Sequence, residues 1–228
     1  MRARDPLGLS PRPYNDEPTA SIDMKLYQSD RAPNPRRVRV FMAEKGIDFN
    51  DIEIINLDLM AAENLTDEYK RKNPLGGVPT LELDNGTCIA ESMAISRYFE
   101  EIYPEPPLMG TSAEDKAIVE MWNRRMELAF LFPVAMAFRN ISGAFSDREK
   151  CSREFGEISL ERAGKMFGFL NEHLANNEYI AGDSYSVADI TALCTVDFAR
   201  VVKLRIGEDH THLKRWHDAV SARESAKA

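Results

Sequence analysis

A polar turn near the beginning of the chain has the residue types of an anion-binding site. The stretch YQSDRAPNPRRVRVF, residues 27–41, starts like the end of a strand, is broken by Pro33 and Pro35, and continues as an arginine-bearing helix. The N-terminus of a helix has unpaired N–H groups and a partial positive charge. The tip of this helix carries no Cys, Tyr or His. It could therefore stabilise an anion, but it supplies no nucleophile of its own.

Two later segments, each at the boundary of a predicted strand, carry further candidate site residues. Val78 and Pro79 follow a pair of glycines, and by themselves they indicate only the start of a strand. Glu91 and Ser92 lie where a strand is expected to meet the next helix, and both residue types favour a first helical turn. On the residues alone, this pair is a helix cap, a second anion-binding tip, or both.

The elements that would hold these residues alternate between strand and helix from residue 24 onward. Short strand-like runs are separated by segments of helical periodicity, and Asp-Asn-Gly at 84–86 is the strongest short-range signal of a β-hairpin. The predicted order is βαβ followed by ββα, an α+β domain over residues 24–104. Its strands are expected at 24–28, 51–56, 78–83 and 87–92, and its helices at 36–45, 61–72 and 91–103.

The second half of the chain reads as an all-helical bundle. A proline-rich linker over 105–112 separates it from the first domain, because its prolines and glycine cannot continue a helix. No convincing strand follows in residues 113–228, where apolar residues recur at helical spacing. The longest helix is expected to bend at Pro133. Its predicted buried stripe comprises Ile118, Trp122, Met126, Ala129, Phe132 and Met136.

One local signal in the helical half predicts a specific helix start. In the run YSVADI, Ser186 stands three residues before Asp189 and ahead of an apolar periodic segment. This spacing is that of a capping box, in which the two side chains satisfy backbone N–H groups at the start of the helix. Loss of such a cap costs about 1 kcal/mol. We expect the role of this pair to be structural.

Composition excludes several classes of function. The chain has 228 residues, 29 basic and 37 acidic side chains and a formal net charge of -8, without a basic stripe beyond Arg36, Arg37 and Arg39, so nucleic acid is not an expected partner. No apolar run approaches the roughly 18 residues needed to cross a membrane. Three cysteines far apart suit neither a disulfide framework nor a metal site, and they favour a cytoplasmic location. Residues 1–23, which hold four prolines, are expected to be a disordered leader, or to result from a start codon placed too far upstream, since Met24 opens the first periodic segment.

The combination of motifs resembles the cytosolic glutathione S-transferases. The resemblance runs from Met24 to the C-terminus and is carried by NPLGGVPTLEL (73–83), DNGTCIAESMAISRYFEEIYP (84–104) and YIAGDSYSVADI (179–190), in that order. It implies a thioredoxin-like N-terminal domain, a helical-bundle C-terminal domain, a homodimer and glutathione as the co-substrate, with no metal. It also implies roles for individual residues in binding glutathione.

The resemblance places three parts of glutathione on three parts of the chain. Pro79 is expected to be a cis proline, so that the backbone N–H and C=O of Val78 pair with the cysteinyl part, as an added strand would. Glu91 would bind the ammonium of the γ-glutamyl end, while Ser92 and the helix N-terminus would bind its carboxylate. Glutathione supplies the nucleophile, so the protein needs only to ionise its thiol.

The tip at residues 32–36 would then stabilise the thiolate. A free cysteine thiol with a pKa near 8.5 is only about 3% ionised at pH 7, and lowering that pKa by about two units requires roughly 2.7 kcal/mol. Where the related theta, zeta and omega classes have their catalytic Ser or Cys, this chain has Ala32. The expected donor is Asn34, with Ser29 second; a bound water is a further alternative. Asn34 could equally be a turn or N-cap residue.

An apolar electrophile is expected to bind between the two domains. Phe130 and Phe138 lie off the predicted stripe of the long helix and are candidates to line its pocket. The reaction would be conjugation of glutathione to a hydrophobic electrophile or reduction of an organic hydroperoxide. Two alternatives remain: a non-catalytic glutathione-binding or interaction module with the same fold, and a glutathione-dependent isomerase or dehalogenase.

Overall fold

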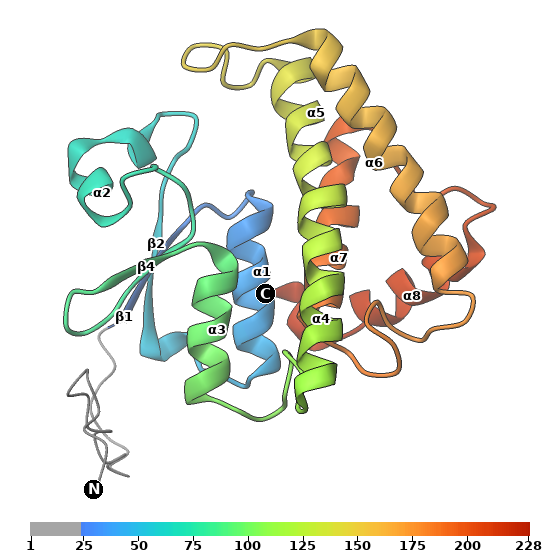
Figure 1. Cartoon of the computed structure of the whole chain (residues 1–228). Coiled ribbons are helices and arrows are strands. Elements are labelled where there is room, and N and C mark those ends of the chain that lie inside the picture. Colours follow the sequence, from blue (N-terminus) through green and yellow to red (C-terminus); the bar gives the residue numbers. More distant parts are fainter. Residues whose placement is uncertain (1–23) are drawn as a thin grey trace, which may run out of the picture.

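The structure is a computed structural model that describes residues 24–228. The expected disordered leader, residues 1–23, lies outside the described residues. Within the described part, a small α+β unit is followed by helices only, which confirms the predicted fold class (Figure 1). Among residues 24–228, none of the helices combines the length and the apolar character that a membrane crossing requires.

The first unit is built on a four-stranded sheet with the strand order β2-β1-β3-β4. β1 is parallel to β2 and antiparallel to β3, and β3 is antiparallel to β4. Because β1 and β2 are parallel, the chain must cross over between them, and the helix α1 makes that crossover. The strands are β1 (Met24–Gln28), β2 (Ile52–Asn56), β3 (Thr80–Glu82) and β4 (Cys88–Ala90), and the helices are α1 (Pro33–Glu44), α2 (Asp67–Lys72) and α3 (Ser92–Ile102).

Two of these helices separate the sheet from the helical unit. Figure 1 shows α1 and α3 side by side between the sheet and α4, and α1 also contacts α7. Their apolar side chains and those of the inner sheet face form one core, with Leu26, Phe41, Leu81, Ile95 and Phe99 fully buried. The start of α1 is therefore held between the two units, where a ligand could contact both.

The second unit packs its helices around α7, which is buried on nearly every side. α5 and α6 form a long antiparallel pair, joined by the loop of residues 143–152 (Figure 1). A separate apolar core fills this unit, including Phe130, Phe167 and Trp216. The helices are α4 (Ala113–Arg125), α5 (Phe132–Ser142), α6 (Arg153–His173), α7 (Val187–Phe198) and α8 (Thr211–Ser221).

A π-helical segment, Met126–Leu131, joins α4 to α5. Pro133 has no N–H, so the carbonyl of Ala129 has no α-helical partner. Just before Pro133 the hydrogen bonds therefore span five residues, as in a π-helix, where an α-helix spans four. Of the predicted stripe, Trp122 and Met126 are buried, but Ile118 is 37% exposed and its neighbour Val119 is buried in its place. After Met126 the wide turn shifts the buried face, so Ala129, Phe132 and Met136 are not core residues. Phe132 is 53% exposed, and the buried positions are Val119, Trp122, Met126, Phe130, Val134 and Ala137.

The capping box at the start of α7 is confirmed. The Asp189 carboxylate is fully buried and accepts four hydrogen bonds, at 2.9 to 3.1 Å, from the N–H of Ile180, the N–H and hydroxyl of Ser186, and the indole N–H of Trp216. Burial raises the pKa of Asp189 to about 6, against the lowering effect of these donors. The carboxylate ties the segments at Ile180, Ser186 and Trp216 to α7.

A buried ion pair fixes the linker between the two units. The Lys45 ammonium lies 2.5 Å from the Glu100 carboxylate and donates to the carbonyls of Pro104 and Pro106. The same carboxylate accepts the backbone N–H of Leu108. The linker is thus held by α1 and α3 on one side, and the relative position of the two units is set next to the start of α4.

Candidate functional site

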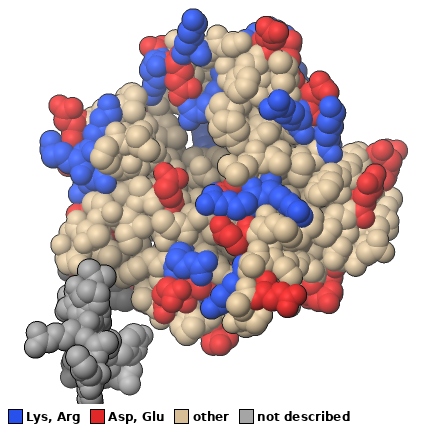
Figure 2. Space-filling view, viewed as in Figure 1, with Lys and Arg blue, Asp and Glu red and all other residues tan. Residues whose placement is uncertain are grey.

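The register of the sheet brings the predicted site segments to one edge. Tyr27, near the end of β1, pairs with Thr80 at the start of β3, and Thr80 also pairs with Ala90 at the end of β4. The turn after β1, the Val78 backbone before β3 and the Glu91 backbone after β4 therefore emerge at the same edge. Figure 2 shows a hollow between the two units above this edge, over the start of α1. The residues predicted separately are brought together.

The tip of α1 has few free donors. Its N-cap is Ala32, which makes no side-chain cap, and two prolines, Pro33 and Pro35, remove two of the first N–H groups. The N–H of Arg36 already bonds to the Ala32 carbonyl at 3.4 Å. Among the described residues, no acceptor is bonded to the N–H of Asn34. The backbone of this tip thus offers one donor, where most helix N-termini offer three or four.

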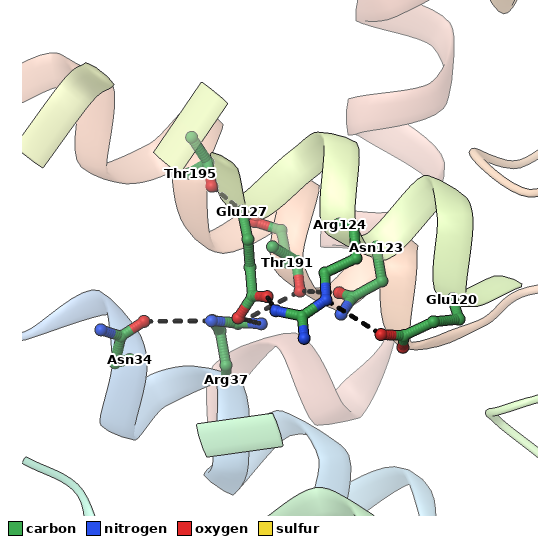
Figure 3. Close-up of polar contacts among 8 residues, drawn as sticks. All are labelled: Asn34, Arg37, Glu120, Asn123, Arg124, Glu127, Thr191 and Thr195. Carbon is green, nitrogen blue, oxygen red and sulfur yellow. Dashed lines mark hydrogen bonds and ion pairs between the residues drawn. The ribbon is translucent and has the colours of Figure 1, made fainter. Parts of the chain in front are cut away.

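The side chain of Asn34 adds a second donor at the same place. Its oxygen accepts a hydrogen bond of 3.1 Å from Arg37, one turn along α1 (Figure 3). Asn34 is exposed, and no acceptor in residues 24–228 is bonded to its amide NH₂ group. The predicted N-cap role passes to Ala32, since Asn34 is the second helical residue. Ser29 ends the strand region, and its carbonyl closes the turn by accepting the N–H of Ala32.

Two side chains shape the loop before β3. The hydroxyl of Tyr69 and the amide of Asn73 both donate to the carbonyl of Gly77, at 2.6 and 2.9 Å. The Val78–Pro79 peptide bond is cis, as the family resemblance implied. Within the described chain, the N–H and C=O of Val78 have no protein partner. An extended peptide could pair with them in the way that an added strand does.

The start of α3 is a fuller anion site than the start of α1. Glu91 is the N-cap residue of α3, with a φ of +70°, but its side chain makes no cap hydrogen bond. Its carboxylate is exposed, whereas Ser92 is buried. No acceptor in residues 24–228 is bonded to the N–H groups of Ser92, Met93 or Ala94. Three donors and a hydroxyl gather here beside a free carboxylate, which suits a zwitterionic α-amino acid group.

Two of the three thiols, those of Cys88 and Cys194, are poorly suited to act as nucleophiles. Burial raises the pKa of the Cys88 thiol, and burial raises the pKa of Cys194 to about 11. Thiols with raised pKa values are poor nucleophiles at neutral pH. Nor do the described residues bring three His, Cys, Asp or Glu side chains together in the way that a metal ion requires.

The loop of residues 143–152 reaches from the helical unit to the first unit. The guanidinium of Arg148 donates to the carbonyls of Leu59 and Met60, at 2.9 and 3.0 Å. Phe145 of this loop packs against Phe138 of α5, with ring centroids 6.3 Å apart. The loop thus joins the two units across the side of α5. It also places Phe145 beside Phe138, which was predicted to line the electrophile pocket.

The two predicted pocket residues differ in position. Phe130 is completely buried, and its ring meets that of Phe167 edge to face at 5.3 Å. It is part of the helical core and has no surface to offer an electrophile, contrary to its predicted role. Phe138 is half-buried and contacts Phe198 as well as Phe145. It remains a candidate.

A cavity of about 360 Å³ opens between α5, α6 and the loop joining them, but none of the residues at the sheet edge lines it. Part of its polar lining is already paired: Arg139 with Glu149, and the Asn140 oxygen with the N–H of Ser152 at 2.8 Å. We assign it no part in binding glutathione. It is lined by Met136, Arg139, Asn140, Glu149, Lys150, Cys151, Ser152 and Phe155.

Comparison with known proteins decides the family. The model of the glutathione S-transferase N-terminal domain matches residues 32–102, and that of the C-terminal domain matches residues 121–224. Glutathione S-transferase 2 of Saccharomyces cerevisiae is 32% identical over 216 residues, covering 94% of this chain and 92% of that protein. The chain belongs to the glutathione S-transferase family.

Solved structures of the family share the whole fold. The crystal structure of Gtt2 from Saccharomyces cerevisiae has 34% sequence identity and a TM-score of 0.85, covering 89% of this chain and 98% of that one. A glutathione S-transferase domain-containing protein of Marinobacter aquaeolei has 38% identity and a TM-score of 0.84, covering 88% and 98%. The predicted glutathione S-transferase fold, with a thioredoxin-like first domain, is thereby confirmed.

Two polar residues that shape this glutathione S-transferase site, and the hydrogen bond between Arg37 and Asn34, were not predicted from the sequence. Tyr69 and Asn73 hold the Gly77 carbonyl, and Arg37 bonds to Asn34. Asn73 was signalled only by its place before a proline and two glycines. Arg37 lies in a run of arginines that reads as a solvated face, yet its side chain is only 3% exposed. A long-range contact of this kind has no local sequence signal.

Proposed function

We propose that this protein is an atypical glutathione transferase, which ionises the thiol of glutathione at a helix tip without a Ser, Cys or Tyr of its own. The observation that carries the proposal is the gathering of unpaired donors at one sheet edge: the Val78 backbone, the start of α3, and Asn34. Membership of the family supports the choice of glutathione, with no metal needed. The expected site of action is the cytoplasm.

Each part of glutathione meets groups of matching chemistry. The γ-glutamyl carboxylate would accept hydrogen bonds from the start of α3 and the Ser92 hydroxyl, and its ammonium would pair with Glu91. The cysteinyl N–H and C=O would pair with the backbone of Val78. This arrangement directs the cysteinyl side chain toward the start of α1, which leaves the same sheet edge.

The thiolate would be stabilised by the N–H and the amide NH₂ of Asn34. Hydrogen bonds to a charged group contribute about 1.5–3 kcal/mol each, which is the order needed to lower a thiol pKa by two units. The sulfur then attacks an electrophilic carbon, forming the thioether while the leaving group departs with the bonding electrons. An apolar electrophile would lie against Phe138 and Phe145, at the side of the hollow between the domains.

Replacing Ser92 with alanine is expected to weaken glutathione binding about tenfold, because one hydroxyl hydrogen bond to a carboxylate is lost while the helix N-terminus remains. Isothermal titration with glutathione measures the change. Ser184→Ala is a matched control, since Ser184 is exposed and lies in the turn before α7. Equal affinity of Ser92→Ala and wild type would remove the γ-glutamyl assignment. Binding without conjugation of an aryl halide would favour the non-catalytic alternative.

We also propose that two copies form a homodimer. Large apolar side chains are exposed on both domains, among them Leu75 (84%), Leu128 (64%) and Phe132 (53%). Sedimentation equilibrium is expected to give about twice the 25.8 kDa mass of one chain. A single-chain mass at micromolar concentration would contradict the proposal.

A further inference from the structure

Arg37 is a buried arginine at the boundary between the two domains. Its side chain is only 3% exposed, and its guanidinium donates in three directions. One nitrogen bonds to Asn34 at 3.1 Å, a second to the hydroxyl of Thr191 on α7 at 3.1 Å, and a third to the Glu127 carboxylate at 2.8 Å (Figure 3). The proposed function uses Asn34 and leaves Arg37 without a role.

The contact with Arg37 decides which way the Asn34 amide faces. An asparagine side chain has an acceptor oxygen on one side and a donor NH₂ on the other, and a guanidinium has donors only. The oxygen of Asn34 must therefore turn toward Arg37, and the NH₂ group must turn away from it. If the amide were reversed, two sets of donors would face each other and the other side would present an acceptor, which would repel a thiolate.

The groups behind Arg37 hold it in place from the helical domain. Glu127 lies in the π-helical segment, and its second oxygen is bonded by Arg124 at 3.3 Å. The Thr191 hydroxyl donates in turn to the buried oxygen of Asn123, at 2.7 Å. Arg37 is thus fixed by α7 and by the segment between α4 and α5, so the orientation of Asn34 depends on both domains.

We propose that Arg37 is a positioning residue for thiol activation: it fixes the Asn34 amide with its NH₂ group toward the glutathione sulfur. This inference rests on the proposed function, in which Asn34 donates to the thiolate. Arg37 acts through Asn34 more than through its charge, because that charge is paired with Glu127 at 2.8 Å. Glu127 lies in the π-helical segment before Pro133, so this segment supplies the ion-pair partner of Arg37.

A double-mutant cycle on the thiol pKa of bound glutathione shows whether Arg37 acts through Asn34 or directly through its charge. Arg37→Met is expected to raise the thiol pKa of bound glutathione by about one unit, which is a tenfold loss of thiolate well below that pKa. In an Asn34→Ala background, the same substitution is expected to change the pKa by less than about 0.3 unit, because its target is gone. Ultraviolet titration of the thiolate in the saturated protein measures all four pKa values.

Two further variants complete the test. Arg36→Met is the matched control: it removes a neighbouring charge, paired with Asp197 at 2.7 Å, and is expected to leave the thiol pKa unchanged. If Arg37→Met does not fold, Arg37→Lys keeps the charge, but its donors lie on a single nitrogen and cannot span the three partners that three separate guanidinium nitrogens contact. This variant is also expected to raise the thiol pKa. An equal rise in both backgrounds, or none in either Arg37 variant, overturns the inference. If Asn34→Ala alone leaves the pKa unchanged, the proposed function itself fails at this residue.

Discussion

Replacing Asn34 with alanine is expected to lower kcat/KM for glutathione conjugation at pH 7 by about 10- to 150-fold, because one hydrogen bond to a charged group contributes about 1.5–3 kcal/mol. The backbone N–H of residue 34 remains in this variant, so catalysis is reduced and not abolished. Since Asn34 is exposed, the fold should not change. The lost interaction is with the thiolate and not the thiol, so the defect should appear chiefly in the ionisation.

The pH profile distinguishes this cause from a general loss of activity. Without the Asn34 amide, the apparent pKa in the pH profile of kcat, measured at saturating glutathione, should move upward, so the difference in kcat from wild type should shrink as the pH rises above the bound thiol pKa. Asn176→Ala, an exposed asparagine in the helical domain, serves as the control. A profile with an unmoved pKa and a uniformly lower rate would contradict the assignment of Asn34 to the thiolate.

Replacing Asp189 with alanine is expected to destabilise the protein by at least about 3 kcal/mol, because each buried donor left unpaired costs about 1–3 kcal/mol. The substitution leaves four donors without their acceptor, from Ile180, Ser186 and Trp216. It also opens a space in the centre of the helical domain. The effect should exceed that of an ordinary helix cap, which is about 1 kcal/mol.

Denaturant unfolding followed by tryptophan fluorescence measures this change, and Trp216 is one of the groups that loses its partner. Asp218→Ala is the matched control, since Asp218 makes an exposed pair with Lys214 whose removal should cost under about 0.5 kcal/mol. An unfolding midpoint for Asp189→Ala close to that of the control would show that α7 does not depend on this carboxylate.

Local patterns predicted most of the first domain and its ligand-facing segments. The DNG hairpin, the proline-glycine breaks and the strand alternation each act within a few residues, so they can be read without knowing the fold. The meeting of Asn34, Val78 and Glu91 at one edge could be expected only from the family resemblance. In the structure, it follows from the pairing of Thr80 with both Tyr27 and Ala90.

The remaining features depend on contacts that no local pattern contains. The buried face of the long helix was misplaced beyond Met126, because a regular 3.6-residue period does not allow for the π-helical turn before Pro133. Phe130 was assigned to a pocket for the same reason, although it packs in the core. Arg37 and Glu127 are 90 residues apart in the sequence, so neither could be paired in advance.

We propose that the tip of α1 ionises the thiol of glutathione with donors from Asn34 alone. Ultraviolet titration of the thiolate in the wild-type protein, saturated with glutathione, measures this ionisation. The expected bound thiol pKa is about 6.5, roughly two units below that of a free cysteine thiol. A bound thiol pKa that stays near 8.5, in a protein that binds glutathione, would contradict it.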